Sequence, residues 1–174
     1  YLPWLGYFDQ MARADKFVFY DDVQYDKDGW RNRNRIKTAQ GPSWLTVPVL
    51  TTGRFAQTIS EVLIDPNQPW PRKHIRALRE AYARARYTND YLPDLEALLS
   101  SAPPNLADLT ISICRMMARW LGIGCATYQS SAMAATPSSG GDRNGRLIAI
   151  CQELGATHYL SGAAARSYLD VDAF

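Results

Sequence analysis

The sequence predicts a mixed α/β protein, and three observations support that class. Short β-rich runs, such as residues 16–20, alternate with longer segments whose apolar residues recur at helical spacing. A chain of 174 residues that is 47% hydrophobic and 21% charged is long enough to bury one core. Toward the C-terminal end, a predicted strand, a Ser-Gly turn and a predicted helix follow one another. We therefore expect residues 1–174 to form a single α/β domain.

The N-terminal third predicts a helix followed by three strands. Apolar residues recur at helical spacing in residues 2–15, and the β-rich run 16–20 comes next. Residues 43–50 and 60–64 are two further predicted strands. Pro48 indicates a sheet edge or a break in the first of these, because proline donates no ladder hydrogen bond. The acidic segment that follows the first strand predicts an irregular strand and loop region.

The middle of the chain, about residues 69–122, predicts helices. Residues 70–87 place Arg and Glu on an outer face, as in a helix with one side on a core. Residues 92–99 predict a second, short helix. Asn105 is the predicted N-cap of a third helix, which has enough apolar residues to be buried and ends at Gly122.

The C-terminal part predicts the remainder of a sheet. Residues 126–130 are a short predicted strand, and Asp142 is the predicted N-cap of a helix over 143–154. Residues 157–160 predict a strand, and residues 163–170 predict the start of another helix. A strand, turn and helix in this order indicate an open, mostly parallel, Rossmann-like sheet flanked by helices.

Charge and cysteine content argue against several classes of function. The net charge of +2 is too small to indicate binding to nucleic acid. No run approaches the roughly 18 apolar residues that insertion into a membrane needs. Cys114, Cys125 and Cys151 show no metal-ligand spacing and predict reduced thiols in a cytoplasmic protein. Fifteen of the 19 basic residues are arginine, whose planar fork of donors suits carboxylate and phosphate.

Residues 30–35 (WRNRNR) form the strongest candidate site. In an extended chain the three arginines share one face, about 7 Å between neighbours, and the two asparagines point the other way. Such a face suits a phosphate or carboxylate anion. Two alternatives stay open. The arginines could instead form ion pairs with nearby aspartates, or the segment could be a helix, in which only Arg31 and Arg35 share a face.

Acidic residues and a second loop extend this interpretation. Mg²⁺ favours carboxylate oxygens and phosphate-bearing substrates, so a magnesium cofactor stays open. The aspartates concerned are Asp21, Asp22, Asp26 and Asp28. Before Arg143, a Gly-Gly-Asp loop enters a helix, where free backbone N–H groups can bind an anion. The spacing of Cys151, His158 and Ser161 does not indicate a covalent mechanism.

Two long segments resemble the signatures of the WbqC-like protein family. The first is YLPWLGYFDQMARADKFVFYDDVQYDKDGWRNRNRIKTAQGPSWLTVPV, at the N-terminal end. The second is DRNGRLIAICQELGATHYLSGAAARSYLD, near the C-terminal end. Family members have a Gln-Pro before the Tyr-Leu-Pro and continue beyond the final Phe of this chain. We therefore expect the chain to be truncated at both ends.

The resemblance implies an enzyme of bacterial surface-polysaccharide (O-antigen) biosynthesis. The implied reaction transfers a small acyl or amino-acyl group, such as glycine, to an amino sugar or sugar nucleotide. A sugar nucleotide or acyl donor is then the small-molecule partner, and nothing indicates an oligomeric state. Asp22 or His158 is the candidate catalytic base that deprotonates an amine. The implied substrate-binding residues are Trp30, Asn32, Arg33, Asn34, Asp142, Arg143, Asn144, Ser161 and Gly162.

Two other functions stay open. The N-terminal loop, helix and strand also resemble, more loosely, the start of nucleotidyltransferase-type Rossmann-like domains. Those enzymes place His-x-Gly-His where this chain has Leu-Gly-Tyr-Phe at residues 5–8, and this departure disfavours adenylyl transfer. Alternatively, a non-catalytic scaffold would use the five tryptophans and ten tyrosines to stack on carbohydrate or a partner.

Overall fold

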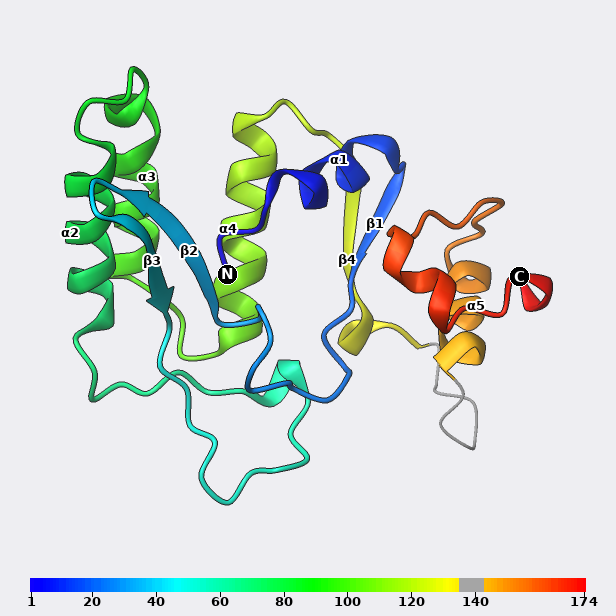
Figure 1. Ribbon diagram of the computed structural model, residues 1–174. Coiled ribbons are helices and arrows are strands. Elements are labelled where there is room, and N and C mark those ends of the chain that lie inside the picture. The colour runs from blue at the N-terminus through cyan, green and yellow to red at the C-terminus, as the bar shows by residue number, and fades with distance from the viewer. Residues whose placement is uncertain (135–142) are drawn as a thin grey trace. The chain divides into compact units, whose positions relative to one another are not determined.

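A computed structural model describes residues 1–134 and 143–174 (Figure 1). The helices are α1 (Leu5–Arg13), α2 (Trp70–Tyr82), α3 (Thr88–Ser100), α4 (Leu106–Trp120) and α5 (Arg143–Glu153). The strands are β1 (Lys16–Phe19), β2 (Arg33–Thr38), β3 (Gly41–Thr46) and β4 (Ala126–Gln129).

Contacts divide the chain into two compact units. The first unit contains Tyr1–Pro3 and Asp21–Gly122, and the second contains Trp4–Tyr20 and Ile123–Phe174. Each unit is described separately. The expectation of a single domain over residues 1–174 stays a prediction.

An antiparallel hairpin of β2 and β3 lies in the first unit, with β2 against α2. Gly41 has a φ of +110°, which L side chains rarely adopt, and it begins β3 directly after the two-residue turn. On one hairpin face Ile36 and Leu45 are buried, and the alternate residues face outward. The extended interpretation of the Arg-Asn segment is therefore confirmed from Arg33 onward, while Arg31 precedes the strand.

Three helices also contribute to the first unit's core, with α3 contacting both α2 and α4. The predicted cap of α4 is confirmed, because the Asn105 side chain accepts hydrogen bonds from the backbone N–H groups of Ala107 (2.7 Å) and Asp108 (3.3 Å). Along α4, Leu106, Leu109 and Ile113 are fully buried. This is the pattern expected of the predicted buried helix.

The boundary between α2 and α3 differs from the prediction. α2 ends at Tyr82 rather than at residue 87, and α3 begins at Thr88 rather than at residue 92. The Tyr82 carbonyl accepts hydrogen bonds from the N–H of Ala85 and the hydroxyl of Thr88. These bonds close a turn where the sequence periodicity alone would continue the helix.

The predicted strand at residues 60–64 is wrong. Ile59–Glu61 form a short 3₁₀ helix, stabilised because the Glu61 carboxylate accepts a hydrogen bond from the Thr58 N–H at 2.8 Å. Beyond it, single bridges pair Val49 with Ile64 and Leu63 with Asn105. The predicted strand at 43–50 is also shorter, since β3 ends two residues before Pro48.

In the second unit, β1 and β4 pair in parallel, with Phe17 opposite Thr127. Both predicted strands are confirmed, and so is a helix, α5, where residues 143–154 predict one. The predicted strand at 157–160 does not form. Tyr159 instead stacks on Phe174, with 4.9 Å between ring centroids, and residues Ala163–Ser167 form a short 3₁₀ helix. The predicted N-cap Asp142 lies outside the described residues.

The described residues therefore form two separate two-stranded sheets, one parallel and one antiparallel. They do not form the open, mostly parallel Rossmann-like sheet that the sequence predicts. One reason is local: β2 and β3 are joined by a two-residue turn, which allows only antiparallel pairing. The mixed α/β class is confirmed. No helix in the described ranges is long and apolar enough to cross a bilayer.

Candidate functional site

Two arginines and two tryptophans cluster on the outer face of the β2–β3 hairpin: Trp30, Arg33, Arg35 and Trp44. We call them the arginine–tryptophan cluster. The register places Arg35 directly opposite Trp44, with 5.5 Å from the Arg35 Cζ atom to the ring centroid. The Arg33 Cζ atom lies 5.1 Å from the same ring, and the two indole centroids are 5.1 Å apart. Trp30 and Trp44 are 56% and 48% exposed, so a ligand can reach both rings.

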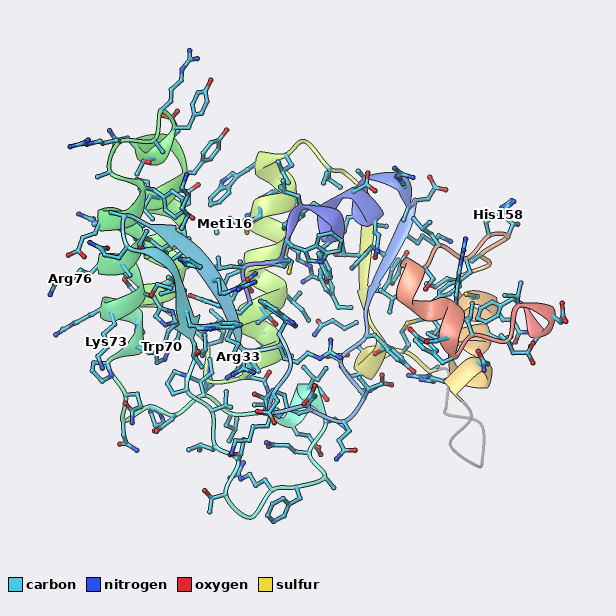
Figure 2. The ribbon with its side chains drawn as sticks, in the orientation of Figure 1. Arg33, Trp70, Lys73, Arg76, Met116 and His158 are labelled. Atoms are coloured by element: carbon cyan, nitrogen blue, oxygen red, sulfur yellow. The ribbon has the colours of Figure 1, made fainter. Side chains whose placement is uncertain are left out.

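Arg33, labelled in Figure 2, is held in place by the loop that precedes the strand. Its Nε donates to the Gly29 carbonyl at 3.2 Å, and its Nη2 donates to the Asp28 carbonyl. Within the described residues, no ion pair joins Arg33 or Arg35 to an aspartate. The alternative of a local ion-pair network is therefore not supported for these two arginines. Their charge instead lies over aromatic rings, which cation–π attraction favours.

The side chains of the two asparagines in this segment form hydrogen bonds with backbone groups. Asn32 is buried, and its Nδ2 donates to the Val47 carbonyl at 2.8 Å. Its Oδ1 is buried without a hydrogen-bond partner. The Nδ2 of Asn34 donates to the Leu2 carbonyl at 2.5 Å, and its Oδ1 accepts from the Arg35 N–H at 2.7 Å. Both amides thus connect this segment to distant backbone carbonyls, and their role in substrate binding stays a prediction.

The aspartates of the irregular region belong to the same unit. Asp21 is buried and its carbonyl accepts from the Ser60 N–H at 2.8 Å, while Asp22 is half-buried. In the part of the chain that the structure describes, no three His, Cys, Asp or Glu side chains are arranged to hold a metal ion. The aspartates therefore form no three-ligand metal site within the described ranges, and magnesium binding stays a prediction. Asp22 as a catalytic base stays a prediction.

The remaining candidates lie in the second unit. Asn144 Oδ1 accepts a hydrogen bond from the Asp170 N–H at 3.1 Å, which ties α5 to the C-terminal segment. His158 is exposed (Figure 2), and its Nδ1 lies 3.0 Å from the Thr157 hydroxyl. Burial raises the pKa of Tyr159, and hydrogen bonding with the Ser161 side chain opposes this effect. A Cβ added at Gly162 would lie 3.2 Å from Nε2 of Gln10.

The structure thus brings together part of the predicted site. Trp30 and Arg33 are neighbours in the arginine–tryptophan cluster of the first unit. Asn144, His158 and the Ser161–Gly162 pair belong to the second unit, where Arg143 begins α5. Asp142 lies outside the described residues. A pocket that both units share therefore stays a prediction.

Sequence reasoning missed the buried environment of His74. This residue is 5% exposed, and its Nδ1 lies 2.8 Å from the Tyr1 hydroxyl oxygen. Its ring centroid lies 5.2 Å from that of Trp70. Burial lowers the pKa of His74 to about 4, against the opposing effect of a hydrogen bond with the backbone of Thr46. The position of His74 four residues after Trp70 was the available signal, because i and i+4 share a helix face.

Sequence reasoning also missed two residues near candidate site residues, one in each unit. Trp44 completes the arginine–tryptophan cluster, and the register that places it opposite Arg35 depends on the hairpin turn. Arg146 is 5% exposed on α5, and its Nη2 donates to the Ser130 carbonyl at 3.0 Å. No spacing in the sequence distinguishes this buried arginine from the exposed ones.

The fold and the site define a mixed α/β protein with cations and indoles exposed on a short hairpin. The chain belongs to the WbqC-like protein family, whose model matches residues 1–174. It is 42% identical over 175 residues to a Mycobacterium tuberculosis protein described as uncharacterized protein Rv1507c. The match covers 100% of this chain and 74% of that protein. No solved structure matches the chain.

Proposed function

We propose that this protein is an enzyme of bacterial surface-polysaccharide biosynthesis in the cytoplasm. It transfers a small acyl or amino-acyl group to an amino sugar carried on a nucleotide. The observation that supports this best is the arginine–tryptophan cluster, where two arginines without a carboxylate partner in the described residues lie over two half-exposed indoles. A sugar nucleotide offers the complementary parts, since its diphosphate is anionic and its base and sugar are flat enough to stack.

In this proposal the hairpin binds and orients the acceptor. The carbonyls of Gly29 and Asp28 preset the Arg33 guanidinium, so less side-chain freedom is lost when phosphate oxygens bind. Arg35 is more exposed than Arg33 and provides the second cation. The donor's carbonyl carbon then forms a bond to the amine nitrogen and releases the donor's leaving group. The amine proton passes to Asp22 or His158, the two candidate bases.

A ligand-binding measurement tests the proposal. We expect a uridine diphosphate sugar to raise the midpoint of thermal unfolding, and uridine diphosphate alone to do so nearly as well. In Arg35→Lys the effect should shrink, because lysine cannot donate two parallel hydrogen bonds to a phosphate. Arg54→Lys is the matched control, since Arg54 is an exposed arginine of the same unit outside the cluster. Equal shifts in both variants, or no shift in the unmodified protein, would refute the binding role of the hairpin.

A second candidate is a non-catalytic carbohydrate-binding protein. The exposure of Trp30 and Trp44 favours it, because indole faces stack on sugar rings. Stabilisation by free sugars without any response to nucleotide diphosphates would indicate this function instead.

A further inference from the structure

An apolar groove lies beside the turn that joins α2 to α3, and Trp120 at the end of α4 also lines it. Its volume is about 300 Å³, at the lower end of the range for small-molecule sites, roughly 300–1,000 Å³. The residues that form most of its walls are Leu78, Tyr82, Tyr87, Tyr91, Leu95 and Trp120. We call it the aromatic groove.

The walls of the aromatic groove combine buried leucines with exposed aromatic side chains. Leu78 and Leu95 are buried, whereas Tyr87 and Tyr91 are 52% and 42% exposed. The Tyr91 ring centroid lies 5.1 Å from that of Trp120 and 6.4 Å from that of Tyr87. Such a contiguous exposed set of aromatic rings typically marks a binding surface rather than ordinary protein surface.

The turn that borders the groove is fixed by hydrogen bonds. The Ala85 N–H donates to the Tyr82 carbonyl at 2.9 Å, and the Thr88 N–H donates to the Ala85 carbonyl at 3.2 Å. The Thr88 hydroxyl donates to the Tyr82 carbonyl as well. The groove is therefore largely preformed, which reduces the entropy that a ligand must overcome.

Arg86 is the charged residue among those that line the groove. Its Cζ atom lies 5.1 Å from the Tyr87 ring centroid, and it forms no ion pair within the described ranges. Two arginines of α2 do have acidic partners, because Arg76 pairs with Glu80 and Arg79 pairs with Glu96. An apolar groove thus has one cation at its border without an acidic partner.

We propose that the aromatic groove binds a single-chain amphipathic anion, with the alkyl chain against the tyrosines and the anionic head group at Arg86. A fatty carboxylate is the simplest molecule of this class. A neutral head group would leave Arg86 unused, and a cationic one would be repelled. The groove uses elements other than the hairpin, so this proposal does not depend on the proposed function.

Isothermal titration of the whole chain with three ten-carbon probes tests the head group. Each probe is kept below its micelle concentration: decanoate, decanol and decyltrimethylammonium. We expect decanoate to bind roughly 2–5-fold more tightly than decanol, the range of an exposed charge pair. Arg86→Gln should remove this difference, while Arg84→Gln, which changes an exposed arginine outside the lining, should preserve it. Equal binding of all three probes would overturn the proposal.

Filling the groove tests the position of the alkyl chain. Ala85 is exposed and lines the groove, so Ala85→Phe occupies space there without disturbing the core. We expect it to weaken decanoate and decanol alike, by roughly tenfold if two methylene groups lose their contacts. Unchanged affinity in Ala85→Phe would overturn the proposal. Binding to anionic vesicles without any binding of monomeric decanoate would also overturn it, in favour of a membrane surface.

Discussion

Acidification from pH 6.5 to pH 4 is expected to lower the free energy of unfolding by about 3 kcal/mol through His74 alone. Burial lowers the pKa of this imidazole from 6.5 to about 4 in the folded protein. Between these two values the unfolded chain binds a proton at His74 and the folded chain does not. The stability is therefore fully present above pH 6.5 and declines as the pH falls toward 4.

Urea denaturation at several pH values measures this effect. His74→Gln should be less stable than the unmodified protein at pH 7, because the contacts to Tyr1 and Trp70 are weakened. Its stability should nevertheless fall less steeply between pH 6.5 and pH 4. His158→Gln, a change at an exposed histidine, is the matched control. A His74→Gln slope equal to that of the unmodified protein would contradict the linkage.

Replacement of Asn105 by alanine is expected to lower the free energy of unfolding by about 2 kcal/mol. The side chain does two things in the structure. Its Oδ1 caps α4, and its Nδ2 donates to the Ser60 carbonyl at 2.6 Å, which ties α4 to the 3₁₀ helix Ile59–Glu61. Alanine removes both contributions and leaves the first backbone N–H groups of α4 without this cap.

The midpoint and slope of urea denaturation at pH 7 provide the measurement. Asn105→Asp keeps an acceptor for the cap but loses the Nδ2 donor. Its free energy of unfolding should therefore decrease, but by less than that of Asn105→Ala. Asn67→Ala, an exposed asparagine in a loop of the same unit, should change the stability by less than about 0.5 kcal/mol. A similarly small change in Asn105→Ala would show that the cap contributes little.

Predictions from the sequence succeeded where the pattern was local. The Asn105 cap follows from one residue type before an apolar helix, and the outward face of Arg33 and Arg35 follows from strand alternation. They failed where the outcome depended on distant partners. Residues 157–160 have a β-rich composition, yet Tyr159 stacks on Phe174 and the segment pairs with no strand among the described residues.

The candidate site shows the same division. Trp30 and Arg33 could be predicted from the Arg-Asn alternation together with the family resemblance. Trp44 could not, because its position over the two arginines depends on the hairpin register. Asn32 and Asn34, which the resemblance implies as substrate-binding residues, both donate hydrogen bonds to backbone carbonyls. An asparagine amide can form hydrogen bonds with a ligand or with backbone groups. The residue type alone therefore does not distinguish a binding role from a structural one.

The sequence by itself determined the α/β class, the family and the alternation that turns Arg33 and Arg35 outward. Periodicity and capping decide these features, because they act between residues a few positions apart. The tertiary structure alone decided that β1 pairs with β4 across more than a hundred residues, that His74 is buried, and that Trp44 joins the arginines. Such contacts depend on which distant surfaces exclude water together, and no short stretch of sequence contains that information.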